Sequence, residues 1–191
     1  MPVDLLPKLK RKPVIAGIRL GADLERALAE GVEVFFALAG TIFDLEETAS
    51  RICAARRLVF AHIDLIEGVG RDGAGLRYLA RNFGIHGILS TRSALVRAAR
   101  EEGLLAIQRL FLLDSEALNT GIQVVERSEP DAVEVLPGLI IPSMIHRLPV
   151  EKLPPIIAGG LVETEPELRA ILATRVVAVS TSKEALWSFT P

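Results

Sequence analysis

The sequence predicts a compact α/β protein whose parallel strands close into a TIM-like (β/α) barrel. Short apolar runs alternate with helical segments along the chain, which indicates parallel strands joined by right-handed crossovers. The runs are apolar on both faces, as strands covered on both sides are. No glycine fingerprint follows the first run, where an open dinucleotide-binding sheet would carry one. The chain has 191 residues, fewer than the ~250 of a typical barrel. We therefore expect residues 1–191 to form one barrel domain of seven to eight strands with short helices and loops.

The predicted strands and helices alternate from one end of the chain to the other. Strands are expected at residues 14–19, 32–39, 58–64, 86–91, 104–110, 132–136, 155–159 and 176–180. Helices are expected at residues 23–30, 44–55, 72–83, 93–102, 114–127, 142–147, 165–173 and 183–187. The residues expected to cap helices are Asp23, Asp44, Asp72, Ser93 and Asp114. A short amphipathic helix within residues 4–12 is expected to cover the bottom of the barrel.

The composition disfavours several classes of protein. A net charge of −2 and a pI of about 6.0 lack the basic balance typical of nucleic-acid-binding proteins. The single cysteine, Cys53, excludes a disulfide framework and favours a reducing compartment. No apolar run approaches the ~20 residues of a membrane span, and the first residues lack the apolar core of a signal peptide. We therefore expect a soluble cytoplasmic protein, and the mean hydropathy of +0.37 is compatible with a homodimer.

Two stretches late in the chain have the features of a phosphate site. Gly159 and Gly160 end the seventh predicted strand, and glycine allows a backbone to approach a ligand closely. Ser180, Thr181 and Ser182 follow the last apolar run, before a short predicted helix whose first N–H groups would attract an anion. Phosphate sites of (β/α)8 barrels lie in the loops after strands seven and eight. The alternative is that the three hydroxyl residues serve only as helix caps.

Further polar residues occur near the ends of other predicted strands. They are Arg19, Asp64, Glu67, Arg92, Gln108, Arg109 and Glu134. Glu134 lies in mid-strand and must pair with a cation, which one of the three arginines in this set can supply. That pair is either a structural ion pair or a ligand contact. Gln108 and Arg109 are adjacent, so they cannot both point into the barrel.

Four acidic or imidazole side chains could alternatively hold a divalent cation, because hard cations prefer oxygen ligands. They are His62, Asp64, Glu67 and Glu134. Their spacing is weak evidence for such a site, and a histidine such as His62 is more often a hydrogen-bonded core residue than a ligand or a base. The sequence therefore predicts no metal and no cofactor.

Common catalytic groups are scarce in this sequence. None of the five lysines lies within a predicted strand, which disfavours Schiff-base chemistry. The cysteine lies on a predicted helix, and no G-x-S-x-G motif is present. Glu134 could act as an acid or a base, although nothing in the sequence distinguishes it. These observations favour a binding protein over an enzyme, and no catalytic residue is predicted.

Several motifs occur in an order that resembles a known family. The motifs are HIDLIEG at 62–68, STR at 90–92, QRLFLLDS at 108–115, EVLPG at 134–138, IAGGL at 157–161 and VSTS at 179–182. Together they resemble the glycerol uptake operon antiterminator regulatory protein family, over residues 12–187. The stretches 62–68 and 108–115 are the specific ones, since the glycine and serine motifs occur in many phosphate-binding barrels.

The resemblance implies a barrel that responds to glycerol 3-phosphate and acts on leader mRNA of glycerol-utilisation genes to prevent transcription termination. By matching positions it implies that the phosphate binds at Gly159, Gly160, Ser180, Thr181 and Ser182. It implies that the polyol end faces Arg19, Asp64, Glu67, Arg92, Gln108, Arg109 and Glu134. Two alternatives are a barrel enzyme of the glycerophosphodiester phosphodiesterase or isomerase type and a ligand-binding barrel whose downstream partner is a protein.

An RNA-binding surface is difficult to locate in this sequence. Seven Phe, one Tyr and one Trp leave few rings for base stacking. The best candidates are Arg71, Arg77 and Arg81 on one predicted helix, with Arg97 and Arg100 on the next. Adjacent barrel helices could join these arginines into one basic strip. The alternative is an ordinary solvated face.

Overall fold

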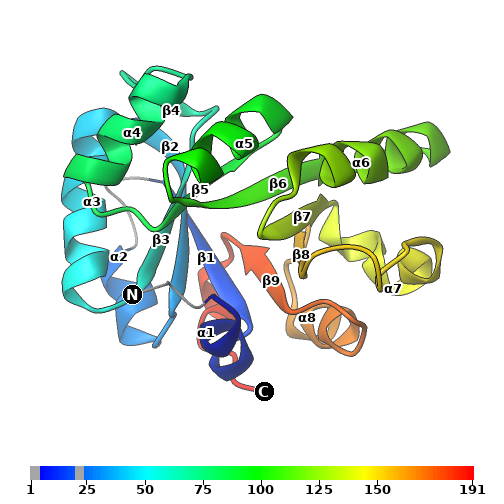
Figure 1. Ribbon diagram of the computed structural model, residues 1–191. Coiled ribbons are helices and arrows are strands. Elements are labelled where there is room, and N and C mark those ends of the chain that lie inside the picture. Colours follow the sequence, from blue (N-terminus) through cyan, green and yellow to red (C-terminus); the bar gives the residue numbers. More distant parts are fainter. Residues whose placement is uncertain (1–4, 20–23) are drawn as a thin grey trace.

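The computed structural model describes residues 5–19 and 24–191 and has eight parallel strands closed into a barrel within them (Figure 1). The barrel strands are β1 (Val14–Arg19), β2 (Val34–Thr41), β3 (Leu58–His62), β5 (Gly87–Ser90), β6 (Leu105–Phe111), β7 (Ala132–Leu136), β8 (Ile156–Gly159) and β9 (Ala178–Thr181). They pair in that order, and β1 pairs with both β2 and β9, which closes the ring. The predicted fold is confirmed.

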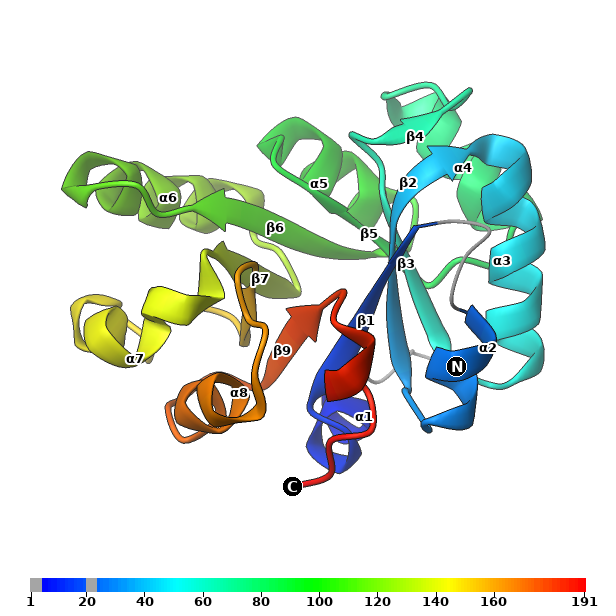
Figure 2. The same ribbon diagram turned by 180° about the vertical axis from the view of Figure 1, so that it is seen from behind.

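Helices surround the strands on the outside, as the front and back views show (Figures 1 and 2). They are α1 (Leu5–Arg11), α2 (Leu24–Ala29), α3 (Ile42–Ala54), α4 (Gly73–Asn82), α5 (Ser93–Glu101), α6 (Ser115–Ser128), α7 (Ile141–Met144) and α8 (Glu165–Leu172). Three single-turn 3-10 helices accompany them, η1 (Gly138–Ile140), η2 (Ile145–Arg147) and η3 (Glu184–Leu186). No helix in the described ranges is long and apolar enough to cross a membrane.

Each barrel strand contributes apolar side chains to two separate clusters. The inner cluster fills the barrel, and its members include Ile15, Phe36, Phe60 and Ile107. The larger outer cluster packs the other faces of the strands against the helices. Strands that are buried on both faces carry apolar residues at nearly every position, which is why the sequence shows uninterrupted apolar runs.

Helix α1 covers the amino-terminal end of the barrel, as the sequence predicts. Its buried side chains, Leu5 and Leu9, belong to the inner cluster. Glu33, directly before β2, contacts Lys8 and Arg11 of this helix, with N–O distances of 3.1 and 2.7 Å. The hydrogen bond from Arg11, opposed by burial and aided by Lys8, lowers the pKa of Glu33 to about 2. Apolar contacts and ion pairs together hold α1 in place.

Several predicted element boundaries differ from the structure. Thr41 rather than Asp44 caps α3, and the two side chains form a reciprocal capping box, because Asp44 is the third residue of the helix. Ser93 is the first residue of α5 rather than its cap, and the cap position is held by Arg92 without a side-chain hydrogen bond. Asp23 lies outside the described residues.

Two of the predicted helix caps are confirmed, and the structure has one short strand that the sequence did not predict. Asp72 and Asp114 accept hydrogen bonds from the backbone N–H groups of Gly75 and Ala117, as predicted. The two-residue strand β4 (Ile66–Glu67) was not predicted, and it pairs with the end of β2. A strand of two residues has too little sequence for a recognisable pattern.

Candidate functional site

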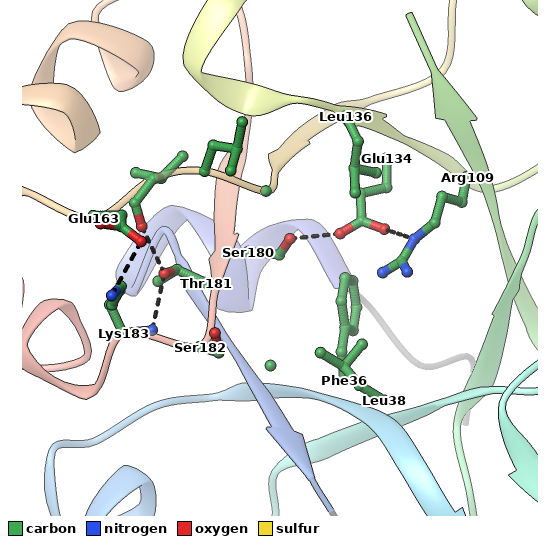
Figure 3. Close-up of a pocket in the computed structure, with 14 residues that line it drawn as sticks. Phe36, Leu38, Arg109, Glu134, Leu136, Glu163, Ser180, Thr181, Ser182 and Lys183 are labelled. Atoms are coloured by element: carbon green, nitrogen blue, oxygen red, sulfur yellow. Dashed lines mark hydrogen bonds and ion pairs between the residues drawn. The ribbon is translucent and has the colours of Figure 1, made fainter.

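A small pocket opens at the carboxyl-terminal end of the barrel, between the loops that follow β8 and β9 (Figure 3). Its volume is about 210 Å³, smaller than the ~300–1,000 Å³ of pockets for drug-sized ligands. The lining residues are Gly17, Phe36, Leu38, Arg109, Glu134, Leu136, Gly160, Leu161, Val162, Glu163, Ser180, Thr181, Ser182 and Lys183. The pocket therefore suits a small polar molecule.

A buried carboxylate forms one wall of the pocket. Glu134 on β7 is only 1% exposed. It accepts hydrogen bonds from Arg109 Nε at 2.6 Å and from Ser180 Oγ at 2.5 Å, and Figure 3 shows these two side chains on either side of it. Arg109 lies directly across from Glu134 in the β6–β7 register. Of the arginines available from the sequence, Arg109 thus supplies the required cation.

Gly159 allows Ser180 and Glu134 to meet. A Cβ atom on this glycine would lie 2.5 Å from Ser180 Oγ and 2.6 Å from Glu134 Oε1, closer than real Cβ contacts. Gly159 is not among the lining residues of the pocket. In the structure this glycine makes room for a buried hydrogen bond.

Thr181 ties together the two loops that border the pocket. Its hydroxyl donates to the backbone oxygen of Val162 at 3.0 Å and accepts from the backbone N–H of Lys183 at 3.1 Å. The indole of Trp187 donates to the backbone oxygen of Thr181 at 3.0 Å. The last strand and both loops are therefore fixed to one another by a chain of buried hydrogen bonds.

The mouth of the pocket carries exposed polar groups. Lys183 pairs with Glu163 across the mouth, with Nζ 3.1 Å from Oε1, and both side chains are about half exposed. Ser182 is exposed beside them. Gly160 has a φ of +81°, a conformation that favours glycine. The predicted helix at 183–187 is the single 3-10 turn η3, which is too short to supply a helix dipole.

His62 faces the barrel interior in an unexpected environment. It is 4% exposed, and neither ring nitrogen has a hydrogen-bond partner among the described residues. Burial, reinforced by the charge of Arg109, lowers its pKa to about 4. The expectation of a hydrogen-bonded core histidine is wrong, and the imidazole is neutral at physiological pH.

Asp64 and Arg92 form a separate cluster beyond β3 and β5. Arg92 Nη2 lies 2.6 Å from Asp64 Oδ1, and Asp64 Oδ2 accepts hydrogen bonds from Ser90 Oγ at 2.8 Å and Thr91 N–H at 2.9 Å. Burial opposes ionisation of Asp64, but these hydrogen bonds and the charge of Arg92 leave its pKa lowered. The cluster holds loop ends together and does not line the pocket.

Gln108 points away from the barrel interior. Its side chain donates to the backbone oxygens of Ser90 and Thr91 and accepts from Ser128 Oγ on α6 at 3.3 Å. Its neighbour Ile107 belongs to the inner cluster, so Gln108 and Arg109 do lie on opposite faces, as their adjacency requires. Gln108 joins the strand to the outer helices and is excluded from the pocket.

The structure brings together about half of the predicted ligand residues. Those that line the pocket are Gly160, Ser180, Thr181, Ser182, Arg109 and Glu134. Those that do not are Gly159, Arg19, Asp64, Glu67, Arg92 and Gln108. Arg19 and Glu67 are exposed at the ends of β1 and β4. In the described part of the chain no three Asp, Glu, His or Cys side chains form a group that could hold a metal ion, so the alternative cation site at His62, Asp64, Glu67 and Glu134 is not formed.

Sequence reasoning missed the apolar lining and the charged pair at the mouth. Phe36 and Leu38 lie two residues apart on the inner face of β2, and both line the pocket. Apolar residues on a buried strand are expected from packing alone, so the sequence does not mark them as part of a site. Lys183 directly follows Ser182, so a cation beside the predicted phosphate loop was the one signal that could have identified the mouth.

The predicted basic strip is partly neutralised. Arg77 makes a bidentate contact with Glu102, the closest pair being Nη2 and Oε1 at 2.7 Å. Arg100 lies 3.5 Å from Glu129, and Arg71 donates to the backbone oxygen of Asp64. Arg81 and Arg97 are exposed on the neighbouring helices α4 and α5. The geometry leaves Arg81 and Arg97 as the better candidates for a contact with phosphate groups.

Fold and pocket define a class, a TIM-like barrel with a small pocket that contains charged and hydroxyl groups, in the loops where barrels of this kind frequently bind phosphate groups. The family model of the glycerol-3-phosphate responsive antiterminators matches residues 14–187. The chain therefore belongs to the glycerol-3-phosphate responsive antiterminator family, which confirms the resemblance seen in its motifs.

Individual relatives are similar to the chain over nearly its whole length. The chain is 33% identical to the uncharacterized protein YgcP of Escherichia coli strain K12, over 97% of each chain. A glycerol uptake operon antiterminator-related protein from Thermotoga maritima MSB8 has a similar crystal structure, with a TM-score of 0.81 and 32% identity over 94% of this chain and 99% of the other. The glycerol uptake operon antiterminator regulatory protein of Listeria monocytogenes str. 4b F2365 gives a TM-score of 0.77 and 29% identity, covering 91% and 94%.

Proposed function

We propose that this protein binds glycerol 3-phosphate in the pocket and, in response, binds leader mRNA of glycerol-utilisation genes to prevent transcription termination. Membership of a family described as glycerol-3-phosphate responsive antiterminators supports the regulatory role. The observation that carries the ligand assignment is the pocket itself, which is small, contains charged and hydroxyl groups, and is bordered by the loops after β8 and β9. We place this activity in the cytoplasm, as the sequence predicts.

The phosphate would bind at the mouth of the pocket. Gly160, Ser182 and Lys183 lie there, and they offer a backbone free of a side chain, a hydroxyl group and an ammonium group. Thr181 is committed to two hydrogen bonds, so it would shape the loop rather than bind the anion. Since η3 provides no helix dipole, we assign the main electrostatic attraction to Lys183.

The polyol end would lie deeper, against Glu134 and Arg109. A carboxylate accepts hydrogen bonds from hydroxyl groups, and the guanidinium of Arg109 uses only its Nε in the contact with Glu134 given above. A buried carboxylate would repel an anionic group at that position, so the charged end of the ligand belongs at the mouth. The pair is then both a structural ion pair and the inner wall of the site.

The decisive test is a titration of leader RNA with and without glycerol 3-phosphate. We expect the RNA affinity to increase at least tenfold at saturating glycerol 3-phosphate, which is a coupling of about 1.4 kcal/mol. Calorimetry measures ligand binding separately. Binding of glycerol 3-phosphate without any RNA binding would refute the RNA part of the proposal and favour a protein partner.

The RNA surface is proposed to include Arg81 and Arg97. The double variant Arg81→Glu, Arg97→Glu is expected to weaken RNA binding and its salt dependence while glycerol 3-phosphate binding is unchanged. The control, Arg127→Glu with Arg175→Glu, makes the same change of charge at exposed arginines elsewhere. Equal RNA affinities in the two double variants would remove the strip on α4 and α5 from the proposal.

An enzyme acting on a phosphate ester has less support. Among the residues that the structure describes, Glu134 is the one acidic residue of the inner wall, and it already accepts hydrogen bonds from Arg109 and Ser180. Turnover of glycerophosphodiesters by the purified protein would nevertheless show directly that this alternative is correct. A homodimer stays a prediction, which light scattering would test.

A further inference from the structure

His62 is an exception among the buried polar side chains of the barrel. In the described ranges, its two ring nitrogens are the only buried side-chain nitrogen or oxygen atoms without a hydrogen-bond partner. Leaving such groups unpaired is costly, and an unpaired group in a folded protein usually has a partner that is not part of the chain. The position of His62 therefore needs a partner, either ordered water or a bound molecule.

His62 is not among the residues that line the pocket, but the order of the strands places it on the barrel wall beside the pocket's inner end. Pocket residues come from β2, with Leu38, and from β6, with Arg109. The strands between them in the barrel are β3 and β5. Leu58 and Phe60 belong to the inner cluster, so His62, two residues further along β3, faces the interior as well. His62 thus occupies the part of the barrel wall that connects Leu38 with Arg109.

The charges around His62 identify the kind of group that it can bind. Burial and Arg109 keep the imidazole neutral, with a pKa of about 4. A neutral imidazole offers one N–H donor and one nitrogen acceptor. A hydroxyl group, which both donates and accepts, matches it. A carboxylate or a phosphate offers only acceptors once ionised, and it would also meet the buried carboxylate of Glu134.

We propose that His62 is a specificity-determining residue that hydrogen-bonds a hydroxyl group of the phosphate ester bound in the pocket. The inference rests on the proposed function and adds a means of selection to it. A ligand without hydroxyl groups would leave the imidazole unpaired, and sites built to bond a hydroxyl discriminate strongly against analogues that lack it. His62 then distinguishes a polyol phosphate from inorganic phosphate and from simple alkyl phosphates.

The test compares glycerol 3-phosphate with propyl phosphate, which has the same phosphate and carbon chain but no hydroxyl groups. Calorimetry gives the ratio of the two affinities for the wild-type protein, for His62→Phe and for the control His146→Phe at an exposed position. We expect the preference for glycerol 3-phosphate to fall about tenfold in His62→Phe and to persist in the control. Propyl phosphate should bind His62→Phe at least as well as it binds the wild-type protein, because no imidazole is then left unpaired.

The possible failures are distinguishable. If neither phosphate ester binds the wild-type protein, the proposed function is wrong and the inference falls with it. If both bind and His62→Phe keeps the wild-type ratio, only the role of His62 is refuted. Should the variant not fold, nitrogen NMR of the labelled wild-type protein provides the same decision. Glycerol 3-phosphate, but not propyl phosphate, should then shift the ring signals of His62 and leave those of His146 in place, and equal shifts with both ligands would overturn the inference.

Discussion

The two ends of the barrel each contain a buried glutamate, but their surroundings differ. At the amino-terminal end Glu33 contacts Lys8, Arg11 and Arg57, and α1 covers the opening. At the carboxyl-terminal end Glu134 contacts one cation and one hydroxyl group, and it lines an open pocket. The first carboxylate is surrounded by protein cations, whereas the second lies beside groups that still have hydrogen-bonding capacity.

This difference indicates that the amino-terminal end of the barrel serves stability and that the carboxyl-terminal end serves binding. Ion pairs around Glu33 hold a helix over the apolar interior. The hollow beside this helix is lined mostly by apolar side chains, among them Leu6, Leu9 and Phe189. At the other end, the barrel accepts a less favourable arrangement that includes an unbonded histidine. Such arrangements are expected where a protein binds a ligand rather than where it only packs.

Removing the carboxylate at the pocket should have the largest effect of any single change. Glu134→Leu leaves Arg109 buried without its partner, and breaking a buried pair in this way costs about 3–5 kcal/mol. Urea unfolding measures the loss. The double variant Glu134→Leu, Arg109→Met removes both charges and should recover most of the stability. A single variant as stable as the wild-type protein would show that this pair is not a buried ion pair in solution.

A methyl group at Gly159 should disturb the same end in a smaller way. Gly159→Ala places a Cβ within 2.5 Å of Ser180 Oγ, and we expect a loss of about 1–3 kcal/mol from overpacking. Gly73→Ala is the matched control, because a Cβ there meets no atom within 4 Å and should stabilise the helix by ~0.4–1 kcal/mol. Equal unfolding midpoints for the two variants would contradict the close packing around Ser180.

Low pH should reduce the stability of the folded protein, because Glu33 at the amino-terminal end of the barrel becomes protonated. Its pKa is lowered from 4.5 to about 2 in the folded protein, so its contribution to stability is complete above pH ~4.5 and is lost as the pH falls towards ~2. We expect roughly 2 kcal/mol after allowance for solvent screening. The measurement is the difference in free energy of unfolding between the wild-type protein and Glu33→Gln, as a function of pH. A difference that does not change with pH, as expected for the exposed control Glu46→Gln, would argue against this role.

The strands and the fold could be predicted because a buried parallel strand leaves a strong pattern, a short apolar run bounded by glycines and caps. The capping residue of α3 could not be predicted in the same way. Thr41 and Asp44 are both good capping residues three positions apart, and the local sequence does not show which of them precedes the helix. The strand β4 could not be predicted, because its existence depends on the position of the end of β2.

The site could be predicted only in part, for a physical reason. On β6 both faces are buried, so alternation shows that Gln108 and Arg109 point in opposite directions without showing which one points inward. Asp64 and Arg92 both follow strand ends, as ligand residues often do, but they bind one another across neighbouring strands. The missing bonds of His62 result from the absence of neighbours, which no single-sequence pattern records.

The charged pair at the mouth should have the smallest and most selective effect. Glu163 and Lys183 are about half exposed, so substituting either should change the free energy of unfolding by less than about 1 kcal/mol. Lys183→Met should weaken glycerol 3-phosphate binding about tenfold, because a phosphate would lose its cation. Glu163→Gln should strengthen binding about threefold, because it removes a carboxylate that competes for Lys183 and repels the phosphate. Lys152→Met, at an exposed lysine outside the pocket, is the control. Opposite shifts in glycerol 3-phosphate affinity for the two mouth variants, with unchanged stability, would show that the carboxyl-terminal end of the barrel binds the ligand, whereas the amino-terminal end only stabilises the fold. Equal affinities would show that the mouth does not hold the phosphate.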